Sequence, residues 1–160
     1  MICNGSRRRT PRRAGAALLL LLCPLLGFAQ VRVEDAWVRG SVPGQRSTGA
    51  FMRLLPSTDA ALVGATSPAA GHLEIHATTM DGGIMRMRSL SRVPLKANQP
   101  LELKPGGHHL MLMGLKAPAS EGERIPLVLV FEDASGKRSS VEVTATVRPL
   151  GSDARTKHAH

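Results

Sequence analysis

The stretch IPLVLVFEDASGKRSSVEVTATVR, residues 125–148, contains two strand patterns separated by a turn. Ile125–Phe131 is a nearly continuous apolar run, which is typical of a central strand buried on both faces. Ser139–Val147 alternates valine with polar residues, as expected for a strand with one solvated face. The intervening Asp133-Ala134-Ser135-Gly136 consists of residues that favour turns. This part of the chain is therefore predicted to be β-structure.

Outward from this stretch, the same period-2 pattern recurs along the chain. Turn signals such as Pro43-Gly44, Asp81-Gly82-Gly83 and Pro105-Gly106-Gly107 separate the runs. Several short strands with regular turn punctuation indicate an all-β sandwich or barrel in a single domain. The further runs are Val31–Arg39, Gly49–Leu55, His72–Ala77, Ile84–Ser89 and His109–Met113.

The first 29 residues have the features of a secretory signal peptide. Five arginines between Arg7 and Arg13 precede an apolar run from Ala14 to Phe28, and small residues at Gly27 and Ala29 suit cleavage after Ala29. The apolar run is short for a membrane span, which needs about 20 residues. Cys23 follows a leucine instead of a small residue, which disfavours lipidation. We expect a signal at 1–29, a folded domain at 30–149 and a disordered polar tail at 150–160.

Removal of the signal changes both the charge and the thiol content. The remaining chain has 16 basic and 12 acidic residues, a net charge of +4, which calls for no nucleic-acid partner. Both cysteines, Cys3 and Cys23, lie in the signal, so the mature protein would fold on its hydrophobic core without disulfides. The few aromatic residues also argue against a stacking platform for single-stranded nucleic acid.

Histidines and methionines form rows on one face of three predicted strands. Because side chains alternate along a strand, His109 and Met111 share a face in the segment 107–113. Met87 faces away from its arginine neighbours, and His72 and His76 share a face. Thioether sulfur and neutral imidazole together favour Cu(I), whereas zinc sites seldom use thioethers. A blue-copper site is excluded in the mature chain because it needs a cysteine.

The spacing of these residues resembles the signature of the periplasmic PCu(A)C copper chaperones. His76 is followed after ten residues by Met87, and Met87 after twenty-one residues by His109, with Met111 two positions further on. The segments DAWVR (35–39), LEIH (73–76), GIMRMR (83–88) and LKPGGHHLMLM (103–113) are also similar to the family. The resemblance covers most of the chain after the signal. It implies a cupredoxin-like (immunoglobulin-like) Greek-key β-sandwich with His76, Met87, His109 and Met111 as Cu(I) ligands.

The resemblance also implies a function, a location and partners. It implies a periplasmic metallochaperone, not an enzyme, that delivers copper toward the binuclear copper centre of cytochrome c oxidase. The partner would be a copper-accepting protein, such as an oxidase subunit or a thiol-bearing assembly factor, with no stable membrane span after signal cleavage. Some family members bind Cu(II) on a C-terminal extension. His158 and His160 form a very short version of it, a candidate for weak Cu(II) binding.

Two other functions fit the same residues. A copper-scavenging or tolerance protein would store the ion, and a metal-free structural sandwich would use the His/Met rows as core. Considered individually, Met52, Met85 and Met113 are predicted to fill the core, because methionine packs into irregular gaps. Met80 is predicted to be exposed, and His72 and His108 to be structural. The sequence contains no nucleophile elbow, P-loop or dinucleotide fingerprint.

Overall fold

The described part of the protein is built from ten β-strands that form one hydrogen-bonded sheet. It is a computed structural model in which Met1 and residues 30–151 are described. The sheet order is β5-β4-β8-β2-β1-β10-β9-β3-β6, with β7 also paired to β2. The strands are β1 (Val31–Arg39), β2 (Ser47–Pro56), β3 (Ala60–Thr66), β4 (His72–Asp81), β5 (Ile84–Leu90), β6 (Val93–Leu95), β7 (Leu101–Leu103), β8 (His108–Met113), β9 (Arg124–Asp133) and β10 (Arg138–Arg148).

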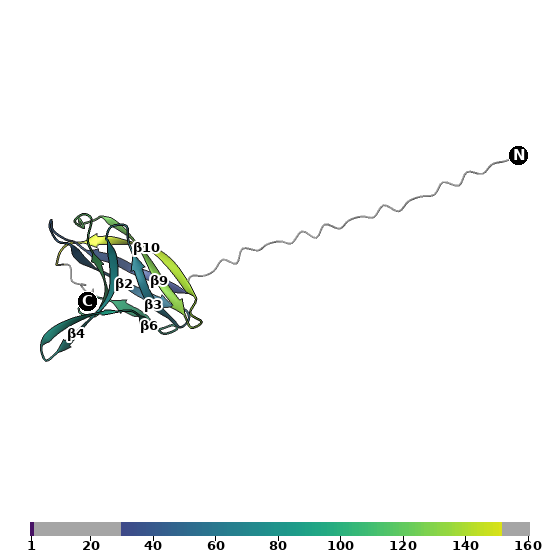
Figure 1. Cartoon of the computed structure of the whole chain (residues 1–160), viewed down its shortest axis with the longest axis horizontal. Helices are drawn as coiled ribbons and strands as arrows, with labels where there is room; N and C mark the ends of the chain where they lie inside the picture. The colour runs from purple at the N-terminus through teal and green to yellow at the C-terminus, as the bar shows by residue number, and fades with distance from the viewer. Residues whose placement is uncertain (2–29, 152–160) are drawn as a thin grey trace, which may run out of the picture.

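Strand β1 joins the two layers of a sandwich. It pairs antiparallel with β2 along one edge and parallel with β10 along the other. Strands β5, β4, β8 and β2 form one layer, and β10, β9, β3 and β6 form the other (Figure 1). The predicted all-β, cupredoxin-like sandwich is therefore confirmed. None of the described residues belongs to a helix that is long and apolar enough to cross a membrane.

The hydrophobic core lies between the two layers. Leu110 and Leu112 of β8 and Leu54 of β2 face Leu129 and Phe131 of β9, and all five are fully buried within one core cluster. Burying a side chain of this size stabilises the fold by about 1.5–3 kcal/mol relative to leaving it exposed. On β8 the residues that alternate with these leucines point to the outer face of the layer, which leaves His109 and Met111 for another role.

All seven strand runs predicted from the sequence are strands, and β3, β6 and β7 are additional. β3 has an alanine-rich sequence, and β6 and β7 have only three residues each. The predicted signal at 1–29 and the tail histidines lie outside the described residues, apart from Met1, and both remain predictions.

A β-bulge in β1 changes which side chains face outward. Asp35 has a φ of 51°, and the register with β2 shifts between Glu34 and Trp37. Before the shift Val33 pairs with core-facing Leu54, whereas after it Trp37 pairs with outward-facing Phe51. The extra residue therefore turns Trp37 to the outer face, beside the His/Met rows.

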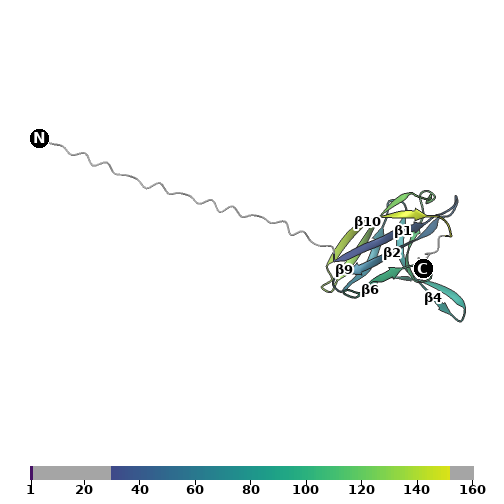
Figure 2. The ribbon, with the colours of Figure 1, turned by 180° about the vertical axis from the view of Figure 1, so that it is seen from behind.

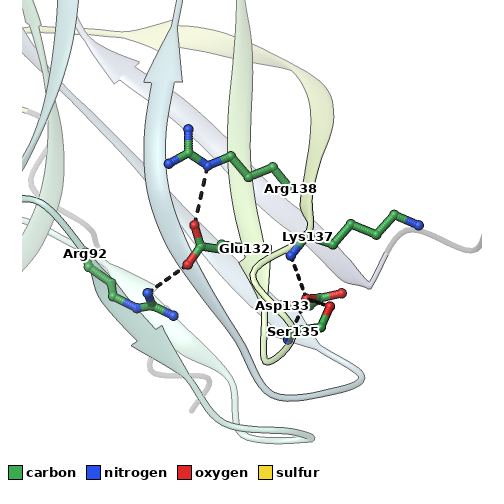
Figure 3. A network of polar contacts seen from close by, with 6 residues as sticks. All are labelled: Arg92, Glu132, Asp133, Ser135, Lys137 and Arg138. Carbon is green, nitrogen blue, oxygen red and sulfur yellow. Dashed lines mark hydrogen bonds and ion pairs between the residues drawn. The ribbon is translucent and has the colours of Figure 1, made fainter.

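A polar network closes the β9–β10 turn (Figure 3). Asp133 accepts hydrogen bonds from the backbone N–H groups of Ser135 and Lys137 and from the Ser135 hydroxyl, and the hydroxyl contributes most to lowering the pKa of Asp133. Glu132 forms ion pairs with Arg92 at 2.9 Å and with Arg138 at 3.4 Å. Exposed pairs of this kind stabilise by about 0–1 kcal/mol each. The network fixes a turn and contains none of the predicted metal ligands.

The β4–β5 hairpin extends beyond the body of the sandwich. Figures 1 and 2 show it as an arm that projects away from the two layers. The base of β4 is paired on both sides, by β5 and by β8 as far as Ala77. Beyond Ala77 it pairs with β5, with one further hydrogen bond from the Thr78 N–H to the Gly107 carbonyl. The hairpin therefore carries Met87 on a segment with little other support.

Candidate metal centre

The four predicted ligands lie on the outer face of one layer, on three adjacent strands. His76 of β4 and His109 of β8 are direct cross-strand partners. Met111 lies two residues beyond His109 on the same face of β8. Met87 of β5 pairs with Thr78, which shares the face of His76. The period-2 pattern in the sequence is thus realised as one His/Met surface.

A hollow in this face is lined by three of the four predicted ligands. Met87, His109 and Met111 contribute to its wall together with Phe51 and Gly49. His76 is not part of the hollow's wall, but its ring lies edge-on to that of His109, with 5.8 Å between ring centroids. The structure therefore brings all four residues to one place, with His76 at the margin of the hollow.

His76 is held in one tautomer by a carboxylate. Its Nε2 lies 2.7 Å from Oε2 of Glu74, and a carboxylate can only accept, so Nε2 carries the proton. The hydrogen bond from His76 is the main cause that lowers the pKa of Glu74, which keeps this carboxyl ionised. Nδ1 of His76 is buried and has no hydrogen-bond partner among the described residues. An unpaired, buried lone pair of this kind is available to a metal ion.

His109 is held in the opposite tautomer by the backbone. Its Nδ1 lies 3.0 Å from the carbonyl oxygen of Gly107, so Nδ1 donates and Nε2 keeps its lone pair. The side chain is nearly fully buried, and burial lowers the pKa of His109, with smaller contributions from His76 and Arg39. The ring is therefore neutral near pH 7, the form that binds metals.

A row of stacked rings supports His109 from the side of β2. The Trp37 and Phe51 centroids are 4.4 Å apart, and Phe51 lies 6.1 Å from the His109 ring. Phe51 folds back over Gly49, where a Cβ atom would lie only 2.7 Å from the ring. Because Gly49 is also the cross-strand partner of Met111, its missing side chain makes room for the Phe51 ring beside that residue. The sequence prediction did not include Phe51 or Gly49.

Met85, predicted to fill the core, is exposed on the hairpin arm, so that prediction is wrong. The alternation that placed Met85 with Met87 was correct, but both point to the outer face of a hairpin that extends past the core. Met52 is buried in the core cluster and Met80 is exposed, as predicted. Met113 lies half-buried on the outer face, outside the core.

The two remaining histidines of the domain lie away from the hollow. His72 is exposed and contacts the second oxygen of Glu74 at 3.3 Å. His108 shares the face of Leu110 and lines a separate hollow with Arg53 and Lys104. Within residues 30–151 no group of three histidine, cysteine or acidic side chains is placed to hold a metal ion. A metal site on this face therefore requires the thioethers.

Comparisons with known proteins identify the family. Residues 31–147 match the family described as "Putative lipoprotein LpqE-like". The protein "Putative lipoprotein Lxx21020" of Leifsonia xyli is 39% identical over 116 residues, which cover 71% of this chain and 69% of that protein. The names of these relatives describe lipoproteins, which are exported proteins, and the signal predicted at 1–29 of this chain would also direct export.

Solved structures with a similar fold include copper-binding proteins. The solution structure of Cu(I)-DR1885 from Deinococcus radiodurans is 33% identical, covers 72% of this chain and 76% of that chain, and superposes with a TM-score of 0.56. The copper-bound PCuAC domain from PmoF2 is 20% identical and covers 76% of this chain and 94% of its own, with a TM-score of 0.62, which shows a shared fold. This chain is therefore a member of the LpqE-like family and has the PCuAC-type fold.

Proposed function

We propose that this protein is an exported metallochaperone that binds one Cu(I) ion through His76, Met87, His109 and Met111. The observation that carries the proposal is the opposite tautomers of the two facing histidines. Glu74 holds the Nε2 proton of His76, and the Gly107 carbonyl holds the Nδ1 proton of His109. Each ring thereby keeps one unprotonated nitrogen, and the two rings share a face with the thioethers of Met87 and Met111.

The donor set selects the metal. Thioethers and neutral imidazoles bind Cu(I) well, whereas Ca²⁺ and Mg²⁺ require oxygen cages. Zinc sites use thiolates, imidazoles and carboxylates and seldom thioethers, and both cysteines of this chain precede residue 30. The solved Cu(I) form of DR1885, at 33% identity, supports the same choice of ion.

The uneven burial of the ligands suits transfer. His109 is buried and fixed, whereas Met87 is 53% exposed on the projecting hairpin. An acceptor can displace the exposed thioether first and then compete for the inner ligands one at a time. We propose that the acceptor belongs to cytochrome c oxidase assembly, at its binuclear copper centre, and that transfer takes place in the periplasm.

An anaerobic competition titration against a chromophoric Cu(I) chelator tests binding. We expect one tightly bound ion, with clearly weaker affinity in Met111→Leu. Met113→Leu is the matched control, since it is the next outward residue on β8 and is not a proposed ligand. Failure to retain one ion, or equal affinity in Met111→Leu and wild type, would overturn the proposal.

A transfer assay separates delivery from storage. Cu(I)-loaded protein is mixed anaerobically with the reduced, copper-free soluble domain of an oxidase subunit. Ferricyanide then removes one electron from each pair of Cu(I) ions, so that an assembled binuclear centre is detected by its mixed-valence absorption. A chaperone yields the assembled centre, whereas a scavenging protein retains its copper in the presence of this acceptor.

A further inference from the structure

Exposed large apolar side chains gather on the hairpin arm. Met80, Ile84, Met85 and Met87 are 66, 60, 62 and 53% exposed, and they are four of the seven exposed large hydrophobic residues among those described. Single exposed apolar residues are ordinary, but a cluster on a projecting segment indicates a role other than packing.

The three methionine side chains of this arm lie on one face of the hairpin. Met80 and Met85 are direct cross-strand partners, so they share a face, and Met87 lies two residues further along the same face of β5. Ile84 pairs with Asp81 and points to the opposite face. Directly paired residues have Cβ atoms about 4.5–5.5 Å apart. Because methionine has several rotatable bonds, the sulfur atoms of Met80 and Met85 can coordinate the same ion.

The tip is continuous with the proposed copper site. Met85 lines the same hollow as Met87, His109 and Met111, whereas Met80 lies beyond it. The methionines thus follow one face from Met80 and Met85 at the exposed tip, through Met87, to the hollow that His109 lines. No core contact explains Met80 or Met85, because both side chains are mostly exposed.

We propose that Met80 and Met85 form a second, weaker Cu(I) site through which the ion enters and leaves the four-ligand site. The inference rests on the proposed function, because it assigns the route of the same ion. Two exposed thioethers without an imidazole bind Cu(I) more weakly than the mixed set, as a transfer position requires.

Titration of protein carrying isotope-labelled methionine methyl groups with Cu(I), followed by NMR, tests the site directly. We expect the first equivalent to shift the methyl signals of Met87 and Met111, and the second to shift those of Met80 and Met85. In the variant Met87→Leu/Met111→Leu, the first equivalent should already shift Met80 and Met85. No shift of these two signals in either protein would overturn the inference.

A leucine pair at the tip separates sulfur chemistry from apolar contact. Met80→Leu/Met85→Leu keeps the apolar surface, so we expect unchanged affinity for the first ion, no binding of a second equivalent and slower release to a chelator. Ile84→Leu is the matched control and should behave as wild type. A leucine pair that releases copper at the wild-type rate would also overturn the inference. If the first equivalent leaves Met87 and Met111 unshifted in wild type, the proposed function itself fails.

Discussion

His76 and Glu74 lie two residues apart on β4 and are joined by a hydrogen bond of 2.7 Å from Nε2 to the carboxylate. The bond orients the imidazole ring and leaves the buried, unprotonated Nδ1 as the only ring nitrogen that could bind a metal ion. Carboxylate partners of this kind also raise the basicity of a ligating histidine. We therefore propose that Glu74 positions His76 for the proposed copper site and is not itself a ligand.

Replacing Glu74 by alanine should weaken Cu(I) binding without removing a ligand. We expect a loss of about 10–100-fold in affinity, the usual effect of removing such a partner. Glu74→Gln keeps an oxygen acceptor for Nε2–H and should lie between wild type and Glu74→Ala in the same competition titration. Equal affinity in all three proteins would show that the carboxylate does not orient His76 for copper.

A side chain at Gly49 should disturb both the ring row and the hollow. In Gly49→Ala the new Cβ would lie 2.7 Å from the Phe51 ring, which is stacked on Trp37 and has little room to move. Overpacking of this kind costs about 1–3 kcal/mol, so the urea midpoint should fall and copper affinity with it.

Gly64→Ala is the matched control for this change. The nearest atom to a Cβ there is that of Val130 at 4.0 Å, an ordinary contact. Removing a glycine from a strand interior is worth about 0.5–1 kcal/mol, so this variant should be as stable as wild type or slightly more so. If Gly49→Ala matches Gly64→Ala, Phe51 is free to shift.

The stability of the copper-free protein should fall as the pH drops below about 7. Burial lowers the pKa of His109, whereas an unfolded histidine has a pKa of about 6.5. The unfolded chain then binds more protons than the folded one, so the free energy of unfolding decreases through this range. Urea midpoints at about pH 7.5 and 5.5 should differ in wild type and differ less in His109→Leu. A flat wild-type profile would contradict the burial of a neutral ring.

The mature protein is expected to begin at Gln30. The first strand starts at Val31, and the carbonyl of Gln30 accepts a hydrogen bond from the Ser57 N–H, so the expected cleavage after Ala29 leaves both features intact. Intact-mass measurement of the exported protein should give residues 30–160. A lipid-modified chain beginning at Cys23 would instead place this protein with lipoproteins, as the names of its relatives suggest.

The alternation of residues predicted which side chains share a face within each strand. It placed His109 and Met111 together on one face, and the resemblance to the copper chaperones added His76 and Met87, which the strand pairing brings to the same outer face. The same rule places Glu74 beside His76, so this partner could have been found. Met85 was misjudged because the sequence does not show that the hairpin extends past the core.

Features set by long-range pairing were not predictable. Strands β6 and β7 have three residues each and exist because β3 and β2 offer them an edge. The outward position of Trp37 depends on a bulge at Asp35, which interrupts an otherwise regular period. The stacking of Phe51 over Gly49 likewise depends on partners from β1 and β8.

The most direct test of the proposed site is X-ray absorption at the copper edge, on protein loaded anaerobically with Cu(I). Wild type should show a mixed shell of sulfur and nitrogen. The second protein carries Met87→Leu/Met111→Leu together with Met80→Leu/Met85→Leu, so that copper cannot move to the tip methionines. Loaded with less than one equivalent of Cu(I), this protein should lose the sulfur from the copper shell. A sulfur shell unchanged in that protein, or a wild-type shell without nitrogen, would contradict ligation by His76, Met87, His109 and Met111.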